Sequence, residues 1–385
     1  MGVFVLSSAL NYLDRQILAA LAPLLRQEFS LTNEGYGKVL AAFSITYAIS
    51  SPLAGWLIDR IGLNRGISVG VGVWSLAGVA TGFVKGLPGL LGCRAVLGAA
   101  ESSGVPAVGK ALHKFLLPRE RALGNAVSQI GLSIGAITAP PLATWFALRH
   151  GWRSAFVFTG FLGMLWIPLW LWVSRKAKPV AEETAGSGSG HAALLRDPRM
   201  WGFVAANVLS MPVYTLWSNW TTLYLKDAQG ATLVQANLLV PIPNFFAYAG
   251  GLAGGWLSLK WVGAGIEALA ARRRVCLASA VALLTTAAVP FMPGPGWATA
   301  VISLSFFAIT AWSVNLYTMP LDCFGGRHAA FSVSLLTGAY GAMQAVISPL
   351  IGAMIDRYGY GPICSMAAVL PAAAYGILHV TRQPR

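Results

Sequence analysis

The sequence predicts an all-α membrane protein with twelve transmembrane helices in two six-helix, pseudo-symmetric bundles. Of the 385 residues, 56% are hydrophobic and only 10% are charged, and the mean hydropathy is +0.63, too apolar for a soluble domain of this length. Apolar stretches of about 20 residues, enough to cross a hydrocarbon core of roughly 30 Å, recur along the chain. We place their centres near residues 14, 46, 76, 101, 134, 164, 212, 245, 284, 308, 341 and 371.

The distribution of basic residues predicts the topology. If both termini are cytoplasmic, about seventeen Lys and Arg lie on the cytoplasmic side and about seven lie outside, which is the positive-inside bias. This bias explains the formal charge of +14, so we expect no nucleic-acid partner. We expect an integral multi-pass protein of the plasma membrane, the inner membrane in a bacterium, surrounded by lipid. The four cysteines form no metal-ligand pattern, and no cofactor is predicted.

The first helix contains two adjacent charges in the stretch NYLDRQ, residues 11–16. A charge at the bilayer centre costs about 2.5–3.5 kcal/mol on insertion scales, so Asp14 and Arg15 require polar surroundings. Neighbours on a helix project about 100° apart. We therefore expect one of the two to face charges on the fourth helix and the other to face a central cavity.

The loop after the second helix reads GWLIDRIGLNR, from Gly55 to Arg65. We interpret the glycine as permitting close helix contact, and the charges as a cluster that holds a cytoplasmic gate in one state and releases it in the other. A simple positive-inside loop that turns at the second glycine is the alternative. The candidate gate residues are Gly55, Asp59, Arg60, Gly62 and Arg65.

The fourth helix carries Arg94 and Glu101, seven residues apart, which places them on one face about 10 Å apart along the axis. One interpretation is static ion pairing, Asp14 with Arg94 and Arg15 with Glu101. Buried pairs add little net stability compared with apolar packing, which favours a role that needs charge. On the fifth helix, the small-residue pattern of Gly131 and Gly135 indicates close packing against a neighbour.

A polar interval with a Gly/Ser run, residues 174–199, divides the chain. We predict an N-terminal six-helix bundle at 1–173, a cytoplasmic linker at 174–199 and a C-terminal six-helix bundle at 200–385. An internal repeat supports this division, because LAGWLIDR at 53–60 is echoed by AGGWLSLK at 253–260. Parallel six-helix halves of this kind are typical of transporters with the binding site between the halves.

The second half has its acids in loops or at helix ends, so a proton carrier is expected in the first half. At mid-helix it offers polar and aromatic side chains that could form a substrate wall, although packing explains each of them equally well. The candidates that we assign to substrate binding are Trp217, Asn219, Trp312 and Gln344.

Three motifs together carry a resemblance to a known family. They are NYLDR, the G-x-x-x-D-R loop and CRAVLGAAESSGVPAVGKALHKFLLPRERA at 93–122, with GWRSAF at 151–156 as a further match. With them the chain resembles the anion:cation symporters of the major facilitator superfamily, which include hexuronate and galactonate transporters, sialin and vesicular glutamate transporters. The resemblance implies that Arg15 engages the substrate carboxylate, that Asp14 takes part in proton coupling, and that Arg94 and Glu101 form the coupled charge pair.

The same resemblance implies that Tyr12 and Tyr47 line the cavity. Two positions depart from the hexuronate pattern, in which an Asn stands three residues after the glutamate and another on the fifth helix. Here these positions are Gly104 and Ser133, so amides suited to sugar hydroxyls are missing, and Ser133 is assigned to substrate binding through its hydroxyl. We therefore expect a carboxylate substrate with fewer hydroxyls, such as a small or aromatic organic acid, with a sugar acid as the alternative.

These observations predict a monomeric secondary transporter, not an enzyme, that moves an organic anion with protons by alternating access. An uncoupled facilitator or anion exchanger, and a lipid transporter of the spinster type, are the competing hypotheses. The five histidines lie at loops or helix ends without a catalytic motif, which argues against an intramembrane enzyme.

Overall fold

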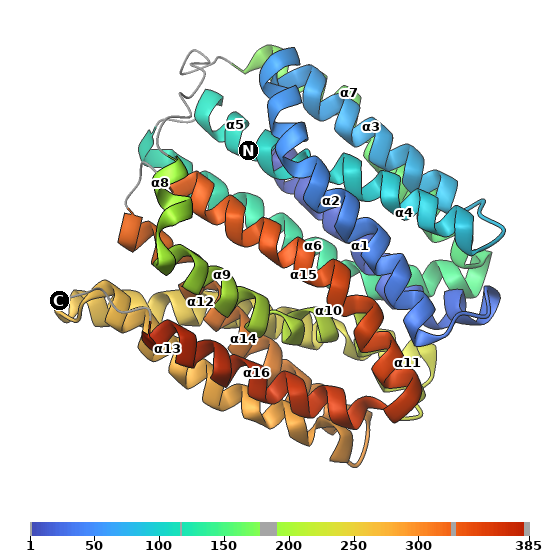
Figure 1. The fold of residues 1–385 in the computed structure, drawn as a ribbon. Helices are drawn as coiled ribbons and strands as arrows, with labels where there is room; N and C mark the ends of the chain where they lie inside the picture. Colours follow the sequence, from blue (N-terminus) through green and yellow to red (C-terminus); the bar gives the residue numbers. More distant parts are fainter. Residues whose placement is uncertain (1, 116–117, 178–190, 325–328, 381–385) are drawn as a thin grey trace. The chain divides into compact units, whose positions relative to one another are not determined.

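The computed structural model describes residues 2–115, 118–177, 191–324 and 329–380, which are almost entirely helical (Figure 1). The chain divides into two compact units, Met1–Gly186 and Ser187–Arg385, which we call the first and second bundles. Part of the predicted linker, residues 178–190, lies outside the described residues. The helices of the first bundle are α1 Gly2–Glu28, α2 Asn33–Ile61, α3 Leu63–Thr81, α4 Leu87–Glu101, α5 Gly104–Phe115, α6 Pro118–His150 and α7 Trp152–Lys176.

The second bundle begins with a six-residue helix and continues to residue 380. Its elements are α8 His191–Arg196, α9 Pro198–Ser210, α10 Pro212–Asp227, α11 Leu233–Leu239, α12 Pro241–Gly263, α13 Ala268–Leu283, the 3₁₀ segment η1 Leu284–Phe291, α14 Pro295–Phe324, α15 Ala329–Tyr358 and α16 Tyr360–Val380.

The predicted fold class is confirmed: this is an all-α membrane protein. Each of the predicted transmembrane segments has its centre within a helix or at a junction between consecutive helices. Here α4 with α5, α9 with α10, α11 with α12 and α13 with η1 are each counted as one membrane pass. By length and composition, six helices of the described residues are apolar enough to cross a membrane.

The two bundles share one pattern of helix pairing. In the first bundle the first pass packs against the fifth, the second against the fourth and the third against the sixth, as α1 with α6, α2 with α4 and α3 with α7. In the second bundle the corresponding pairs are α9 and α10 with α15, α12 with α14, and α13 and η1 with α16. The same arrangement is thus built twice, as the internal repeat predicts.

Glycines bring α6 close to α1, as their spacing indicates. A Cβ atom on Gly131 would lie 2.2 Å from the carbonyl oxygen of Val5, and one on Gly135 would lie 2.4 Å from that of Ala9. A side chain at either position would collide with backbone, so only glycine permits this helix contact. The α1 backbone that carries Asp14 and Arg15 is therefore held directly against α6.

Breaks interrupt three passes, and prolines explain them because proline lacks a backbone N–H and cannot continue the hydrogen-bond ladder. α10 begins with Pro212 and α12 with Pro241. In the fourth pass, α4 ends at Glu101 and α5 begins at Gly104, two residues before Pro106. The hydroxyls of Ser102 and Ser103 donate to the carbonyls of Ala99 and Ala100, each at 2.7 Å, and satisfy part of the helix end.

Asp197 caps the first long helix of the second bundle. Its Oδ1 accepts a hydrogen bond of 2.8 Å from the Arg199 backbone N–H, and its Oδ2 lies 2.7 Å from the Arg199 guanidinium. Hydrogen bonding to the Arg199 side chain is the main cause that lowers the pKa of Asp197, although partial burial opposes it.

We expect Asp197→Ala to destabilise the fold by about 0.5–2 kcal/mol at neutral pH, since an N-cap is lost. Because the pKa of Asp197 is lower in the folded state, its contribution is present above the ordinary aspartate pKa and disappears as the pH falls through the folded value. Thermal unfolding of wild type and variant in detergent should differ at pH 7 and converge in acid. Asp197→Asn keeps a capping side chain and is the control; an equal loss in both variants would contradict the capping role.

Candidate functional site

The charges of the first bundle gather between α1 and α4. The Nε atom of Arg15 donates to Oε2 of Glu101 at 2.6 Å, an ion pair between residues 86 positions apart. The Glu101 side chain is fully buried, whereas 28% of the Arg15 side chain is exposed. The Glu101 carboxylate is therefore inaccessible, whereas a solute could reach the Arg15 side chain.

Aromatic rings of α2 cover a face of the Arg15 guanidinium. The Cζ atom of Arg15 lies 4.8 Å from the ring centroid of Phe43 and 4.9 Å from that of Tyr47. The two rings are stacked with their centroids 5.7 Å apart, as residues one helical turn apart on the same face can be. Cation–π contact of this kind holds the guanidinium in place and leaves its edge for hydrogen bonds.

Asp14 and Arg94 lie deeper in the same bundle, and both are buried. The Asp14 carboxylate has the charges of Glu101, Arg94 and Arg15 around it, and Thr159 of α7, whose hydroxyl donates to the Phe156 carbonyl at 3.3 Å, is a further neighbour. Arg94 places its Cζ atom 5.4 Å from the ring centroid of Phe156, also on α7. Four charged groups from α1 and α4 thus share one site.

Asp14 is buried beside the charges of α4, whereas Arg15 pairs with Glu101 and keeps part of its side chain exposed. The expectation that one of the two faces α4 and the other a central cavity stays a prediction. Of the two ion pairs considered from the sequence, the structure shows Arg15 with Glu101. Among the described residues, neither Asp14 with Arg94 nor Asp14 with Arg15 approaches within ion-pair distance.

Several buried polar atoms of this cluster lack a hydrogen-bond partner in the described part of the chain, namely Asp14 Oδ1, Arg94 Nε and Glu101 Oε1. Each such atom costs about 1–3 kcal/mol of stability. Buried polar atoms of this kind can be satisfied by a bound ligand or by water.

Gly98 positions Glu101 beside Arg15. A Cβ atom on Gly98 would lie 2.2 Å from the carbonyl oxygen of Phe43 and 2.5 Å from the Thr46 hydroxyl, so the α4 backbone touches α2 at this point. Glu101 follows three residues later, on the neighbouring turn of the same helix face. Sequence reasoning missed Gly98 as well as Phe43 and Thr159; the i,i+4 spacing of Phe43 and Tyr47 was the available signal for the ring pair.

The remaining substrate candidates differ in burial. In the first bundle Tyr12, Tyr47 and Ser133 are half-buried and retain accessible surface. In the second bundle Trp217 and Trp312 are fully buried in the helix packing. There, the Asn219 amide donates to the Thr215 carbonyl at 2.9 Å, and Gln344 is half-buried. Their assignment to substrate binding stays a prediction, with Asn219 and Gln344 better exposed than the tryptophans.

The predicted gate residues lie around the end of α2. Gly62 connects α2 to α3 with a φ of +87°, Arg60 lies over the Trp56 ring at 5.4 Å, and Arg65 is exposed. Gly55 faces Pro106 of α5 at a distance that leaves room for a Cβ atom. The side chain of Asp59 lies outside the described residues, so the proposed charge cluster stays a prediction.

Lys110 of α5 contributes a contact to the end of α2. Its Nζ atom donates to the carbonyl oxygen of Ile58 at 3.1 Å, where a cation satisfies and complements the helix C-terminus. No group of three His, Cys, Asp or Glu within the described ranges could hold a metal ion.

Comparison with known proteins gives three kinds of match. The family model of the Major Facilitator Superfamily matches residues 4–332. The hexuronate transporter of Escherichia coli K12 is 28% identical over 390 residues, covering 96% of this chain and 90% of that protein. The D-galactonate transporter of Escherichia coli O6:H1 is 25% identical, with coverage of 95% and 92%.

A probable sulfoacetate transporter of Cupriavidus necator is 28% identical and covers 93% of this chain and 87% of that protein. Among solved structures, a bacterial homologue of the human lysosomal transporter Spinster in an inward-facing, unoccupied conformation matches with a TM-score of 0.76. It shares 18% identity and covers 98% of this chain and 94% of that chain. This last match bears on the fold alone.

Proposed function

The chain belongs to the major facilitator superfamily, and on that basis we propose that it is a secondary transporter that carries an organic carboxylate together with protons. The observation that carries the proposal is the Arg15 to Glu101 ion pair, with its exposed guanidinium and buried carboxylate. Arginine presents a rigid fork of donors that matches a carboxylate. Relatives named for hexuronate, galactonate and sulfoacetate transport support an anionic substrate.

Coupling in this proposal is competition for one arginine. While Glu101 is ionised it occupies the Arg15 guanidinium at 2.6 Å. Protonation of Glu101, and of Asp14 beside it, removes that competitor, and a substrate carboxylate takes its place. Release of the proton on the other side restores the ion pair and expels the anion. Asp14, Glu101 and Arg94 are the coupling residues, and the proton is the coupling ion, with no other cofactor.

The energetics favour cotransport over movement of the anion alone. An elementary charge is worth about 2.3 kcal/mol per 100 mV of membrane potential, and a negative interior opposes entry of an anion. Cotransport with one or more protons makes the load neutral or positive. We propose alternating access of the two six-helix bundles, a monomeric state, the plasma membrane as location, and both termini in the cytoplasm.

For the substrate, we propose a carboxylate with fewer hydroxyls than a hexuronate. Gly104, where the hexuronate pattern has asparagine, begins α5, and a Cβ atom there would meet nothing within 4 Å. Ser133 on α6 is half-buried and offers one hydroxyl in place of an amide. A sugar acid is the alternative substrate. Uptake that stays selective for hexuronate over simple monocarboxylates would contradict the proposal of a substrate with fewer hydroxyls.

Uptake into proteoliposomes tests the function. Purified protein is reconstituted, and a panel of labelled monocarboxylates, aromatic acids and sugar acids is supplied with and without an inward proton gradient. We expect a carboxylate to accumulate only with the gradient, and a protonophore to abolish accumulation. Uptake of no organic anion under either condition would refute the proposal, while counterflow indifferent to the protonophore would indicate an exchanger.

Glu101→Gln should separate coupling from binding. The amide keeps the shape of the side chain but is a neutral competitor, so we expect proton-driven accumulation to fall at least tenfold while anion counterflow persists. Counterflow and gradient-driven uptake are measured in the same vesicles. The control is Glu28→Gln, which removes a carboxylate from an exposed pair with Arg153 and should leave both activities intact. Full gradient-driven accumulation by Glu101→Gln would exclude that residue as the proton carrier.

A further inference from the structure

A second feature lies in the second bundle, in a part of the chain that the proposed transport mechanism does not use. A groove of about 270 Å³ is formed by α12, α13 and α14. Apart from the Ser279 hydroxyl, the side chains that line it are apolar, among them Trp256, Leu257, Leu304 and Phe307. Such a groove suits an apolar ligand, and its volume falls below the roughly 300–1,000 Å³ of pockets that enclose drug-sized molecules.

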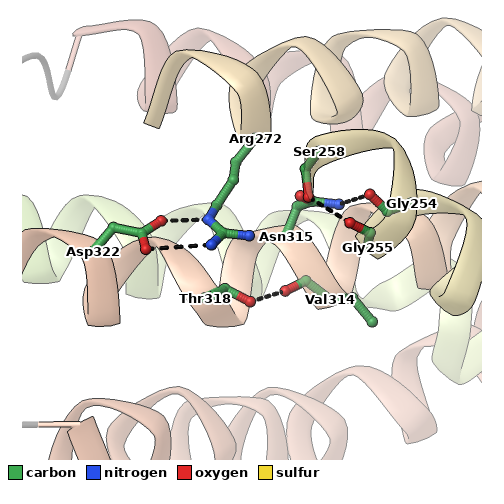
Figure 2. A network of polar contacts seen from close by, with 8 residues as sticks. All are labelled: Gly254, Gly255, Ser258, Arg272, Val314, Asn315, Thr318 and Asp322. Carbon is green, nitrogen blue, oxygen red and sulfur yellow. Dashed lines mark hydrogen bonds and ion pairs between the residues drawn. The ribbon is translucent and has the colours of Figure 1, made fainter. Parts of the chain in front are cut away.

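Small residues create the groove. Alanines at 253, 278, 282, 308 and 311 line it, so the three helices approach one another without filling the space between them. Figure 2 shows how α12 is tied to α14 at one end of this region, where the Asn315 amide donates to the Gly254 carbonyl at 3.1 Å. Trp256 and Leu304 are 62% and 43% exposed and form the rim. The groove is therefore a stable surface feature that opens away from the packed interior.

Positive charge stands at one end of the groove. Lys260 is one turn beyond Trp256 on α12, and its Nζ atom lies 5.3 Å from the Trp256 ring centroid. Arg274 is exposed and stands four residues before Ala278, on the same face of α13. Because only residues 264–267 connect α12 to α13, both cations lie at the same end.

The acids at this end do not cancel that charge. Asp322 is held by Arg272, as Figure 2 shows, so this pair is neutral. Glu267 immediately precedes α13 and is exposed. Neither Lys260 nor Arg274 forms an ion pair with a residue that the structure describes. Two cations against one free acid leave the end of the groove net positive.

We propose that this groove is a binding site for an anionic phospholipid of the surrounding bilayer. One acyl chain lies along the groove against Trp256, Leu257 and Phe307, and the phosphate is bound by Lys260 and Arg274. The bilayer offers acyl chains to this apolar surface, and charge complementarity selects the anionic headgroup over a zwitterionic one. Tryptophan beside lysine is the side-chain chemistry found at the level of the headgroups.

Quenching of Trp256 fluorescence by brominated lipids tests the site. The protein is placed in phosphatidylcholine nanodiscs with increasing fractions of brominated phosphatidylglycerol or, in parallel, brominated phosphatidylcholine. The contribution of Trp256 is the difference between wild type and Trp256→Phe. We expect half-maximal quenching at a several-fold lower fraction of the anionic lipid, and a loss of about fivefold in this preference for each cation removed by Lys260→Gln or Arg274→Gln.

Two further variants distinguish binding of a lipid in the groove from nonspecific electrostatic attraction of lipids to the protein surface. Ala278→Phe fills the groove without changing charge and should reduce Trp256 quenching by both lipids. Lys176→Gln is the matched charge control, because Lys176 lies over the exposed Trp172 ring at 4.0 Å on α7 in the first bundle; it should leave the Trp256 signal unchanged. The proposal would be overturned by equal quenching with both lipids or by an Ala278→Phe variant that behaves like wild type. It would also be overturned if no quenching occurred because another copy of the chain covers the groove.

Discussion

Arg15→Ala is expected to abolish anion uptake. We also expect it to lower the stability of the folded protein in detergent. The variant leaves the buried Glu101 carboxylate without its 2.6 Å partner, which costs about 3–5 kcal/mol for a charge uncompensated in the interior. It also removes the donor group for the substrate carboxylate. Initial uptake rates in proteoliposomes and thermal stability in detergent measure the two losses separately.

Two variants make this result interpretable. Arg15→Ala combined with Glu101→Gln removes the stranded carboxylate, so we expect stability to recover while transport stays absent. Arg153→Ala is the matched control, since it removes an arginine from an exposed pair with Glu28 at 2.9 Å, a kind of pair that adds about 0–1 kcal/mol. Uptake near the wild-type rate by a folded Arg15→Ala variant would remove the case for this arginine as the anion ligand.

Gly98→Ala is expected to impair both stability and transport, although it adds a single methyl group. The new Cβ atom would lie 2.2 Å from the Phe43 carbonyl oxygen, so α4 must move away from α2. Overpacking of this kind costs about 1–3 kcal/mol. Since Glu101, Phe43 and Tyr47 meet Arg15 across this contact, we expect a marked loss of uptake even where the protein is well folded.

Gly92→Ala on the same helix is the matched control. A Cβ atom on Gly92 would meet nothing within 4 Å, and alanine favours a helix by up to about 1 kcal/mol over glycine. Thermal unfolding and uptake should therefore be unchanged or slightly improved. If both variants behave alike, the contact between α4 and α2 does not position the site.

The fold class could be predicted from the sequence because a membrane imposes a simple length and polarity rule on each helix. Intramembrane charge is costly, so Asp14, Arg15, Arg94 and Glu101 stood out without any structure. The seven-residue spacing of Arg94 and Glu101 was enough to place them on one face of a helix.

Most partners of these charges were not predicted, because a helical spacing such as that of Phe43 and Tyr47 does not say which neighbouring helix the face meets. Phe43, Thr159 and Gly98 look like ordinary membrane-helix residues until α2, α4 and α7 are packed together. The contact of Lys110 with the Ile58 carbonyl also depends on packing, because it follows the break before α5. The burial of Trp217 and Trp312 likewise follows from packing in the second bundle.

The break between α4 and α5 also divides the fourth pass into two helical segments joined by a short hinge. The hinge at Ser102 and Ser103 directly follows the titratable Glu101, and serine hydroxyls there replace part of the backbone ladder. Beyond this hinge, Lys110 donates a hydrogen bond to the Ile58 carbonyl at the end of α2. In the proposed cycle Glu101 exchanges Arg15 for a proton directly beside this break, and Lys110 connects the segment beyond it to the last turn of α2.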